Sequence, residues 1–177
     1  MRAARKLSIA AGLAACLAMP IGARADATLT EADDAISALR KADPGLKTFL
    51  DRAAGYAVFP SVGKGGLVVG GAGGSGIVFE KGKAVGKTKL SQVTIGAQVG
   101  GQAYYEIIYF ETAESLAAFK KGEWTMAAQV SAVALKAGAS ANASYKDGVA
   151  VFTLTKGGVM AEASVGGQKF SYEAISG

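Results

Sequence analysis

Five lysines within a glycine-rich stretch are the residues of this chain whose chemistry is most evident. They are Lys64, Lys81, Lys83, Lys87 and Lys89. Ammonium groups beside exposed backbone N–H groups are suited to binding phosphate, including the phosphate of a lipid head group. Lysines also protect the exposed edge of a hairpin from pairing with other chains. The five lysines are therefore candidate ligands for lipid phosphate, with a solvated hairpin edge as the alternative.

A second group of cations falls on two expected helices near the start of the chain. Arg40, Lys41 and Lys47 could lie at a membrane surface, with Phe49 and Leu50 buried in it. The alternative is that these apolar side chains pack in the core. Aromatic residues further along, Tyr104, Tyr105, Tyr109, Phe110 and Trp124, leave the same choice between an acyl-chain pocket and core packing.

Several kinds of chemistry are excluded by composition. The chain has no histidine and one cysteine, Cys16, so residues 26–177 cannot form a Ser-His-Asp triad or a zinc site with thiolate or imidazole ligands. The spacing G-x-G-x-x-G occurs at residues 71–76, but an apolar strand pattern follows where a dinucleotide site requires a helix. The carboxylates show no spacing typical of a catalytic pair. We expect no enzymatic activity, no cofactor and no metal.

The first 25 residues have the features of a secretion signal. Arg2, Arg5 and Lys6 precede an apolar run at residues 7–22, and residues 23–25 (ARA) form a cleavage pattern. The alternative is cleavage within residues 13–16 (LAAC), followed by lipidation of Cys16 as in bacterial lipoproteins. Either alternative predicts an exported, periplasmic protein, and the second anchors it in the membrane.

Removing this segment changes the charge of the protein. Residues 1–25 hold four of the 19 basic residues and none of the 14 acidic ones, which leaves a net charge of +1. A nucleic-acid partner therefore loses its compositional support, because phosphate contacts require a cationic surface. Residues 26–177 have the length of one domain.

Two helices are predicted at the start of this domain. A capping box at Thr30 begins the first, and its apolar positions extend at helical spacing to Ala42. Asp43 and Pro44 then supply a cap and a first helical residue for a short second helix that ends at Gly55.

Beyond Gly55 the pattern is typical of antiparallel strands. Val93, Ile95, Ala97 and Val99 alternate with small or polar residues and predict an apolar strand face. A hairpin is expected from 149–155 and 159–165, a long strand within 124–142 with a helix as the alternative, and an inserted helix at 112–121. The predicted fold class is α+β, with a twisted antiparallel β-sheet or partial barrel, N-terminal helices and one inserted helix.

Four segments together carry a resemblance to a known family. They are residues 55–66 (GYAVFPSVGKGG), the glycine cluster at 70–76, residues 98–104 (QVGGQAY) and residues 157–170 (GGVMAEASVGGQKF). In this order they resemble the SYLF domain, a family of lipid-binding modules similar to yeast actin-patch proteins, over roughly residues 30–173. The resemblance implies phospholipid or a membrane surface as partner, although eukaryotic members use a basic N-terminal region where this chain has Glu31, Asp33 and Asp34.

The function expected from residues and resemblance together is that of a non-enzymatic phospholipid-binding module of the bacterial envelope. It would dock on anionic lipid through its lysines and glycine-rich strands. The alternative is a structural or protein-interaction module of the periplasm, with an envelope protein as partner.

Overall fold

The computed structural model describes residues 26–66, 69–95, 101–122, 124–157 and 163–175. Two helices come first, α1 (Leu29–Ala42) and α2 (Leu46–Arg52). Four long strands follow, β1 (Gly55–Gly66), β2 (Val69–Glu80), β3 (Lys83–Ile95) and β4 (Gln102–Phe110). The remaining elements are α3 (Ala113–Lys120), β5 (Trp124–Thr125), β6 (Ser131–Ala134), the 3-10 helix η1 (Ala139–Asn142), β7 (Val149–Thr155), β8 (Ala163–Ser164) and β9 (Lys169–Ala174).

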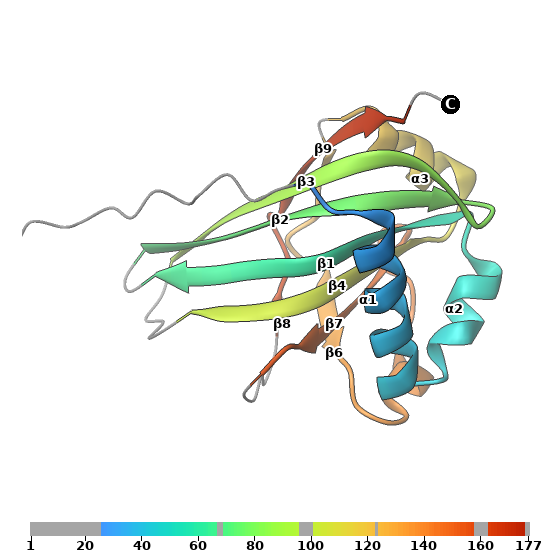
Figure 1. Ribbon diagram of the computed structural model, residues 1–177, viewed down its shortest axis with the longest axis horizontal. Coiled ribbons are helices and arrows are strands. Elements are labelled where there is room, and N and C mark those ends of the chain that lie inside the picture. The colour runs from blue at the N-terminus through green and yellow to red at the C-terminus, as the bar shows by residue number, and fades with distance from the viewer. Residues whose placement is uncertain (1–25, 67–68, 96–100, 123, 158–162, 176–177) are drawn as a thin grey trace, which may run out of the picture.

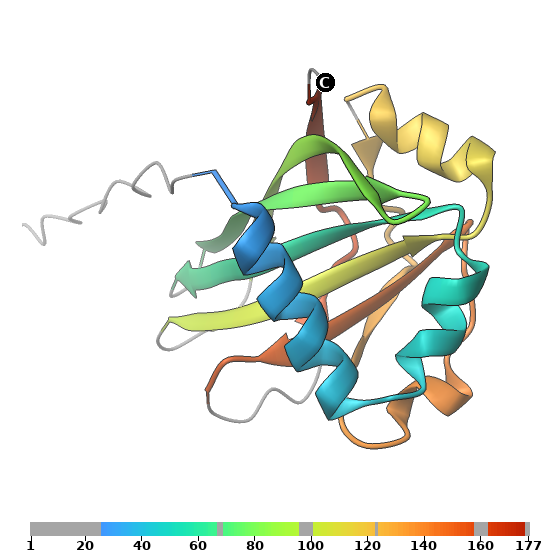
Figure 2. The same ribbon diagram turned by 45° about the vertical axis from the view of Figure 1, so that its right-hand side comes forward.

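The strands form one curled sheet in the order β5-β9-β3-β2-β1-β4-β7-β6-β8. Its pairs are antiparallel except that β6 runs parallel to β7. Figures 1 and 2 show α1 lying across one face of the curl, while α3 lies away from α1, near β9. The predicted α+β class, with a twisted sheet curled into a partial barrel and one inserted helix, is confirmed.

Each face of the sheet carries its own apolar core. On the outer face, which we define as the face covered by α1, Ala32, Ala35 and Leu39 pack with strand residues such as Val58 and Ile77. The inner face is concave and is covered by α3. There the buried residues include Phe59, Tyr104, Phe110, Leu116 and Phe119. Because side chains alternate along a strand, each position of β1 to β4 can be assigned to one face.

The N-terminal helices begin differently from the prediction. Thr28, rather than Thr30, caps α1 and forms the capping box with Glu31. Gly45 precedes α2 and makes no side-chain cap, so the predicted cap at Asp43 is wrong. The buried Asp43 instead accepts hydrogen bonds from the backbone N–H groups of Gly45 and Ser140, at 2.9 and 2.7 Å. This carboxylate therefore ties the helix corner to η1.

Two strand predictions are wrong. The predicted hairpin fails because β8 pairs with β6, while β7 lies between β4 and β6. The predicted long strand within 124–142 is reduced to β5 and β6 with turns and η1 between and after them. In this segment the chain crosses from one edge of the curled sheet to the other, which a single straight strand could not do.

The predicted apolar face of β3 is wrong at Val93. Val93 is 80% exposed, whereas its neighbour Gln92 is buried and donates through Nε2 to the carbonyl of Gly166 at 3.0 Å. Leu90 shares the inner face with Gln92. Ala97 and Val99 lie outside the described residues. A polar side chain thus occupies an inward position because a specific backbone partner is available there.

Every helix within the described residues is too short or too polar to cross a bilayer. Residues 1–25, with Cys16 and both proposed cleavage positions, lie outside the described residues. Export and lipidation therefore remain predictions.

Candidate functional site

The five lysines of the glycine-rich stretch do not form one surface. Lys81 and Lys83 flank the β2–β3 turn, while Lys64 pairs in register with buried Ala72 and so lies on the inner face. Lys87 and Lys89 lie together on the outer face of β3. Their Nζ atoms are 3.4 and 3.3 Å from the carboxylate oxygens of Asp26, just before α1.

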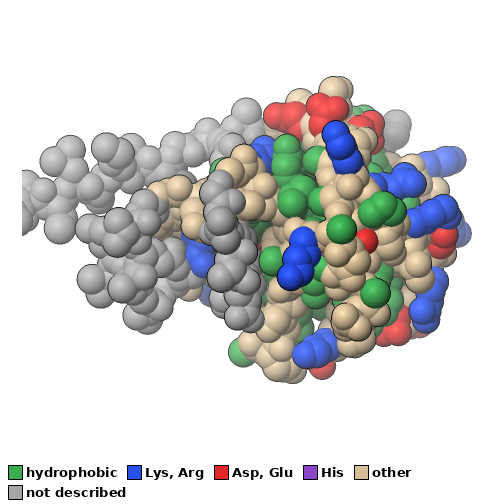
Figure 3. All heavy atoms as spheres, turned by 90° about the horizontal axis from the view of Figure 1, so that it is seen from below, with side chains coloured by type: hydrophobic (Ala, Val, Ile, Leu, Met, Phe, Trp, Pro, Cys, Tyr) green, Lys and Arg blue, Asp and Glu red, His purple; other side chains and the backbone are tan. Residues whose placement is uncertain are grey.

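The cations of the helices are distributed over the lower part of the molecule. Arg40 and Lys41 lie in the last turn of α1, and Lys47 forms an ion pair with Asp51 one turn later in α2. Figure 3 shows lysine and arginine side chains spread over this side, with hydrophobic and acidic groups between many of them. Phe49 is buried against Tyr109 and Phe152, so it is a core residue.

Most of the aromatic cluster is also core. Tyr104, Tyr109 and Phe110 are at most 1% exposed, and Trp124 packs against Phe119 and Phe170. Tyr105 differs because it faces outward beside a pocket at α1. Within the described residues no cluster of three or more acidic, histidine or cysteine side chains is arranged to hold a metal ion.

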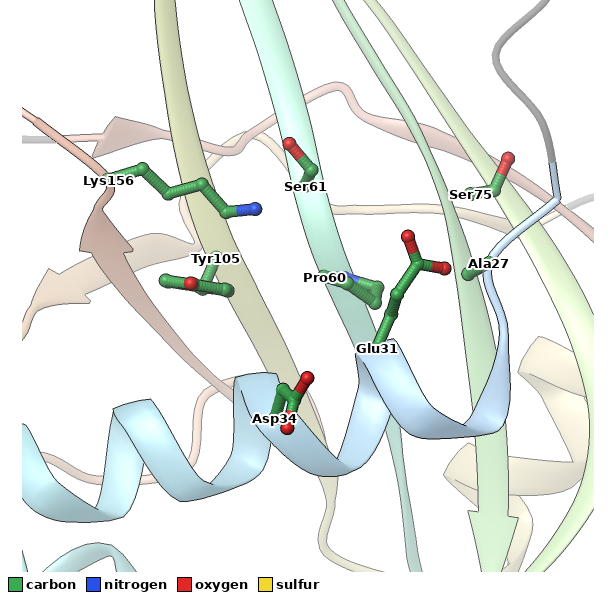
Figure 4. A pocket seen from close by; sticks show the side chains of 8 residues that line it. All are labelled: Ala27, Glu31, Asp34, Pro60, Ser61, Ser75, Tyr105 and Lys156. Carbon is green, nitrogen blue, oxygen red and sulfur yellow. The ribbon is translucent and has the colours of Figure 1, made fainter.

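A cavity of about 200 Å³ lies between the first half of α1 and the outer face of the sheet, and we refer to it as the α1 pocket. Figure 4 shows residues of the helix on one side and residues of the strands on the other. Its lining combines two carboxylates, one ammonium group, hydroxyl groups and one aromatic ring. The lining residues are Ala27, Glu31, Asp34, Pro60, Ser61, Ser75, Tyr105 and Lys156.

An irregularity in β1 shapes the floor of the α1 pocket. The register of β1 shifts between Val58 and Gly63 against β2, and between Phe59 and Val62 against β4. Phe59 and Val62 both enter the inner core, which leaves Pro60 and Ser61 to span the bulge beneath α1. Proline suits this place because it has no N–H to donate to a neighbouring strand.

The charges of the α1 pocket are held in place. The Nζ atom of Lys156 lies 4.4 Å from the ring centre of Tyr105, a cation–π contact. The Oε2 atom of Glu31 accepts from the backbone N and the hydroxyl of Thr28, at 2.9 and 2.8 Å. Asp34 follows Glu31 by three residues, so the two carboxylates lie on the same side of the helix.

The lysine pair of β3 adjoins this pocket. Ser75, which lines it, is the cross-strand partner of Lys89. Asp26 precedes the lining residue Ala27, and hydrogen bonds from Lys89 and Lys87 lower the pKa of the Asp26 carboxyl. The pocket therefore lies beside the ion pairs of Asp26 with Lys87 and Lys89.

The glycines of β1 and β2 fall into two groups according to what a side chain would meet. A Cβ atom at Gly74 or Gly76, which face inward, would come within 2.7 Å of a backbone carbonyl. At Gly65 it would meet nothing within 4 Å, and at Gly73 only the carbonyl of Leu90 at 3.5 Å. Gly71 has less room, because a Cβ there would lie 3.3 Å from the carbonyl oxygen of Gln92. We call Gly65, Gly71 and Gly73, all on the outer face, the glycine face.

None of these three residues has a positive φ, and at Gly65 and Gly73 there is room for a side chain, so neither backbone conformation nor packing explains glycine at these two positions. Gly71 and Gly73 lie in β2 between Ser75 and Val69, which is 66% exposed. The cross-strand partners of Gly71 are Gly65 in β1 and Val93 in β3. Figure 1 shows that β1, β2 and β4 extend well past α1 at this end. The result is a strip of the outer face without side chains, bordered by two exposed apolar residues.

A buried polar pair lies inside the curl and was not foreseen from the sequence. Glu106 is fully buried and accepts a hydrogen bond from Nε2 of Gln168 at 3.0 Å. Burial raises the pKa of Glu106 to about 7, against the opposing effect of this hydrogen bond. Thr153, its cross-strand partner, is also buried. The sequence signal that could have indicated this pair is a polar residue at an inward-facing position of an otherwise apolar strand.

Comparison with known proteins relates this chain to a family. Residues 91–174 match the family model of the Las17-binding protein actin regulator, Ysc84. Beta cell expansion factor A of Aeromonas veronii is 31% identical over 144 residues, which are 80% of this chain and 54% of that protein. The chain thus spans about half the length of this relative.

The predicted SYLF resemblance is therefore confirmed, and the chain carries a domain of this family. The match of the family model begins near the end of β3 and ends in β9, and it includes the Glu106–Gln168 pair. The aligned relative extends the similarity over most of the remaining chain.

Proposed function

We propose that this protein is a non-enzymatic phospholipid-binding module of the bacterial envelope, exported and periplasmic. The family is associated with lipid and with actin patches, and lipid is the partner class that suits an exported chain. The single observation that carries the proposal is the glycine face, which lacks side chains although neither packing nor φ requires glycine at Gly65 and Gly73. Such a surface permits close approach of a flat or flexible partner.

Docking would use the outer face of the β2–β3 ribbon. Val69 and Val93 would enter the boundary between head groups and acyl chains, while Lys87 and Lys89 contact phosphates of anionic lipid. Val93 and Lys89 point to the same face and are four residues apart, about 13 Å along the strand. This spacing lets the lysines reach the head groups while the valines are inserted.

The expected affinity is modest. Burial of two valines contributes up to about 3 kcal/mol each, and a basic residue near an anionic surface about 1 kcal/mol. Asp26 competes with phosphate for both lysines, so their ion pairs with Asp26 reduce the free energy gained from contact with lipid phosphate. Contact with membranes should therefore be reversible and sensitive to salt.

Vesicle co-flotation tests the proposal. The purified protein is mixed with phosphatidylglycerol, cardiolipin or phosphatidylcholine vesicles at low and at moderate salt. We expect binding to the two anionic vesicles, weaker at moderate salt. Absence of binding to all three, together with concentration-dependent self-association, would overturn the proposal in favour of a structural or protein-interaction module.

A further inference from the structure

We propose that the α1 pocket binds a phosphoethanolamine group, the zwitterionic head group of phosphatidylethanolamine. This inference rests on the proposed function, because it specifies which phospholipid head group the protein takes. It concerns a different part of the outer face from the apolar end at Val69 and Val93. The lysine pair of β3 would attract the membrane, and the pocket would select one lipid.

The distribution of charge in the pocket matches a zwitterion. Figure 4 shows Lys156 entering from one side above the Tyr105 ring, while Glu31 and Asp34 project from α1 on the other. A phosphate would lie at the ammonium group of Lys156, and an ethanolamine ammonium at the two carboxylates. A simple anion would leave the carboxylates unfavourably close, and a simple cation would be repelled by Lys156.

The pocket also supplies neutral donors where the phosphate would lie. Ser61 and Ser75 come from adjacent strands, and Figure 4 shows Ser61 between Lys156 and Glu31. A hydroxyl can donate to a phosphate oxygen and needs no change of charge to do so. The cation–π contact holds Lys156 over Tyr105, so little of its conformational freedom remains to be lost on binding.

Size and position agree with a head group that remains attached to its lipid. A cavity of about 200 Å³ is too small for a whole phospholipid but is open to the outer face. From Ser75 the same side of β2 continues over Gly73 and Gly71 to Val69, six residues or about 20 Å away. The glycine face would therefore lie under the glycerol and acyl part of the bound lipid.

Titration with soluble compounds tests the pocket directly. The purified, isotopically labelled protein is titrated with O-phosphoethanolamine, phosphocholine, ethanolamine and inorganic phosphate, while the amide signals of Ser61 and Ser75 are followed by NMR. We expect saturable shifts with O-phosphoethanolamine, and binding about tenfold weaker for ethanolamine or phosphate alone, each of which makes one charge contact less. Phosphocholine should also be weaker, because its quaternary ammonium cannot donate a hydrogen bond.

Matched variants assign the shifts to the pocket. Lys156→Gln and Asp34→Asn should each weaken O-phosphoethanolamine binding about tenfold. Lys146→Gln and Asp33→Asn make the same changes of charge at exposed positions outside the pocket and should leave binding unchanged. Glu31 is not varied, because it also caps α1. The inference would be overturned if inorganic phosphate bound as tightly as O-phosphoethanolamine. It would also be overturned if the control variants weakened binding as much as the pocket variants.

Vesicles separate this inference from the proposed function. Two sets of equal anionic content are compared, one with phosphatidylethanolamine and one with phosphatidylcholine as the neutral lipid. Stronger binding to the first set, lost in Lys156→Gln, supports the pocket. Equal binding to both sets overturns the inference but leaves the proposed function standing. Binding to neither set, with saturable O-phosphoethanolamine shifts retained, would instead overturn membrane docking and keep the pocket.

Discussion

The side-chain amide of Gln168 donates to the carboxyl group of Glu106 across 3.0 Å in the interior of the curled sheet. Gln168 precedes β9, the second strand from one edge of the sheet, whereas Glu106 is in β4 on the other side of β1 to β3. The contact therefore joins two distant parts of the curl through its centre. Because the carboxyl is fully buried, its protonation state affects the stability of the whole fold.

This pair predicts that stability falls as pH rises. The pKa of Glu106 is about 7 in the folded protein, against a usual value of 4.5. Between these values the folded state keeps a proton that the unfolded state has released, so folding loses on the order of 3 kcal/mol from pH 4.5 to 7. Glu106→Gln should remove this decline and raise stability at pH 8. Urea unfolding at pH 5 and pH 8 measures it.

A control for this experiment is Glu111→Gln, which changes an exposed carboxylate at the end of β4. It should keep the decline of the unmodified protein. If Glu106→Gln showed the same pH dependence as Glu111→Gln, the buried carboxyl would not be its source.

The two groups of glycines should respond differently to alanine. Gly76→Ala places a Cβ 2.5 Å from the carbonyl oxygen of Val58 and 2.7 Å from the Phe59 ring, so we expect a loss of about 1–3 kcal/mol. Gly73→Ala meets only an ordinary contact at 3.5 Å and should be neutral or stabilising by up to about 1 kcal/mol. Chemical unfolding of both variants provides the comparison. Equal destabilisation would show that Gly73 is required by the fold.

The exposed valine of β3 should affect lipid binding without affecting stability. Val93→Asp places a charge where the side chain would enter a membrane, and we expect at least tenfold weaker vesicle binding. Because Val93 is 80% exposed, the free energy of unfolding should change by less than about 0.5 kcal/mol. Ile175→Asp is the matched control, an exposed apolar residue beyond β9. Similar losses in both variants would argue against insertion at Val93.

Asp26 should restrain binding to anionic vesicles. Its carboxylate is paired with Lys87 and Lys89, and Asp26→Asn would release both for lipid phosphate. We expect stronger co-flotation with phosphatidylglycerol at low salt, and a smaller difference at moderate salt because exposed charges are screened. Asp33→Asn makes the same change of charge on α1 away from the lysine pair. An increase equal to that of Asp33→Asn would reflect net charge alone.

The elements set by local signals could be predicted from the sequence. The end of α1 at Ala42, the inserted helix capped by Thr112 and the strand at 149–155 all follow from caps, turns and residue patterns. The partner of a strand is not a local property. The β7–β8 hairpin was wrong because β6, which comes earlier in the chain, lies between these strands.

The α1 pocket could be predicted only in part for the same reason. Lys89 was recognised as a candidate, but its position beside Ser75 depends on the register of β2 and β3. Lys156 and Asp34 belong to no motif. Only the fold places them around one cavity, whose floor is the bulge at Pro60 and Ser61. Likewise, the glycine run gave no sign of which glycines face outward.

The pairing of β3 with β9 determines when this protein can finish folding. Thr88 and Ser171 share a hydrogen bond across 83 positions of the chain, so the edge of β3 has its partner only after β9 has been synthesised. Contacts this distant in sequence slow folding, because a large loop must close before they form. A nascent chain should therefore leave this edge of the sheet unpaired, and the domain incompletely folded, until β9 has emerged from the ribosome.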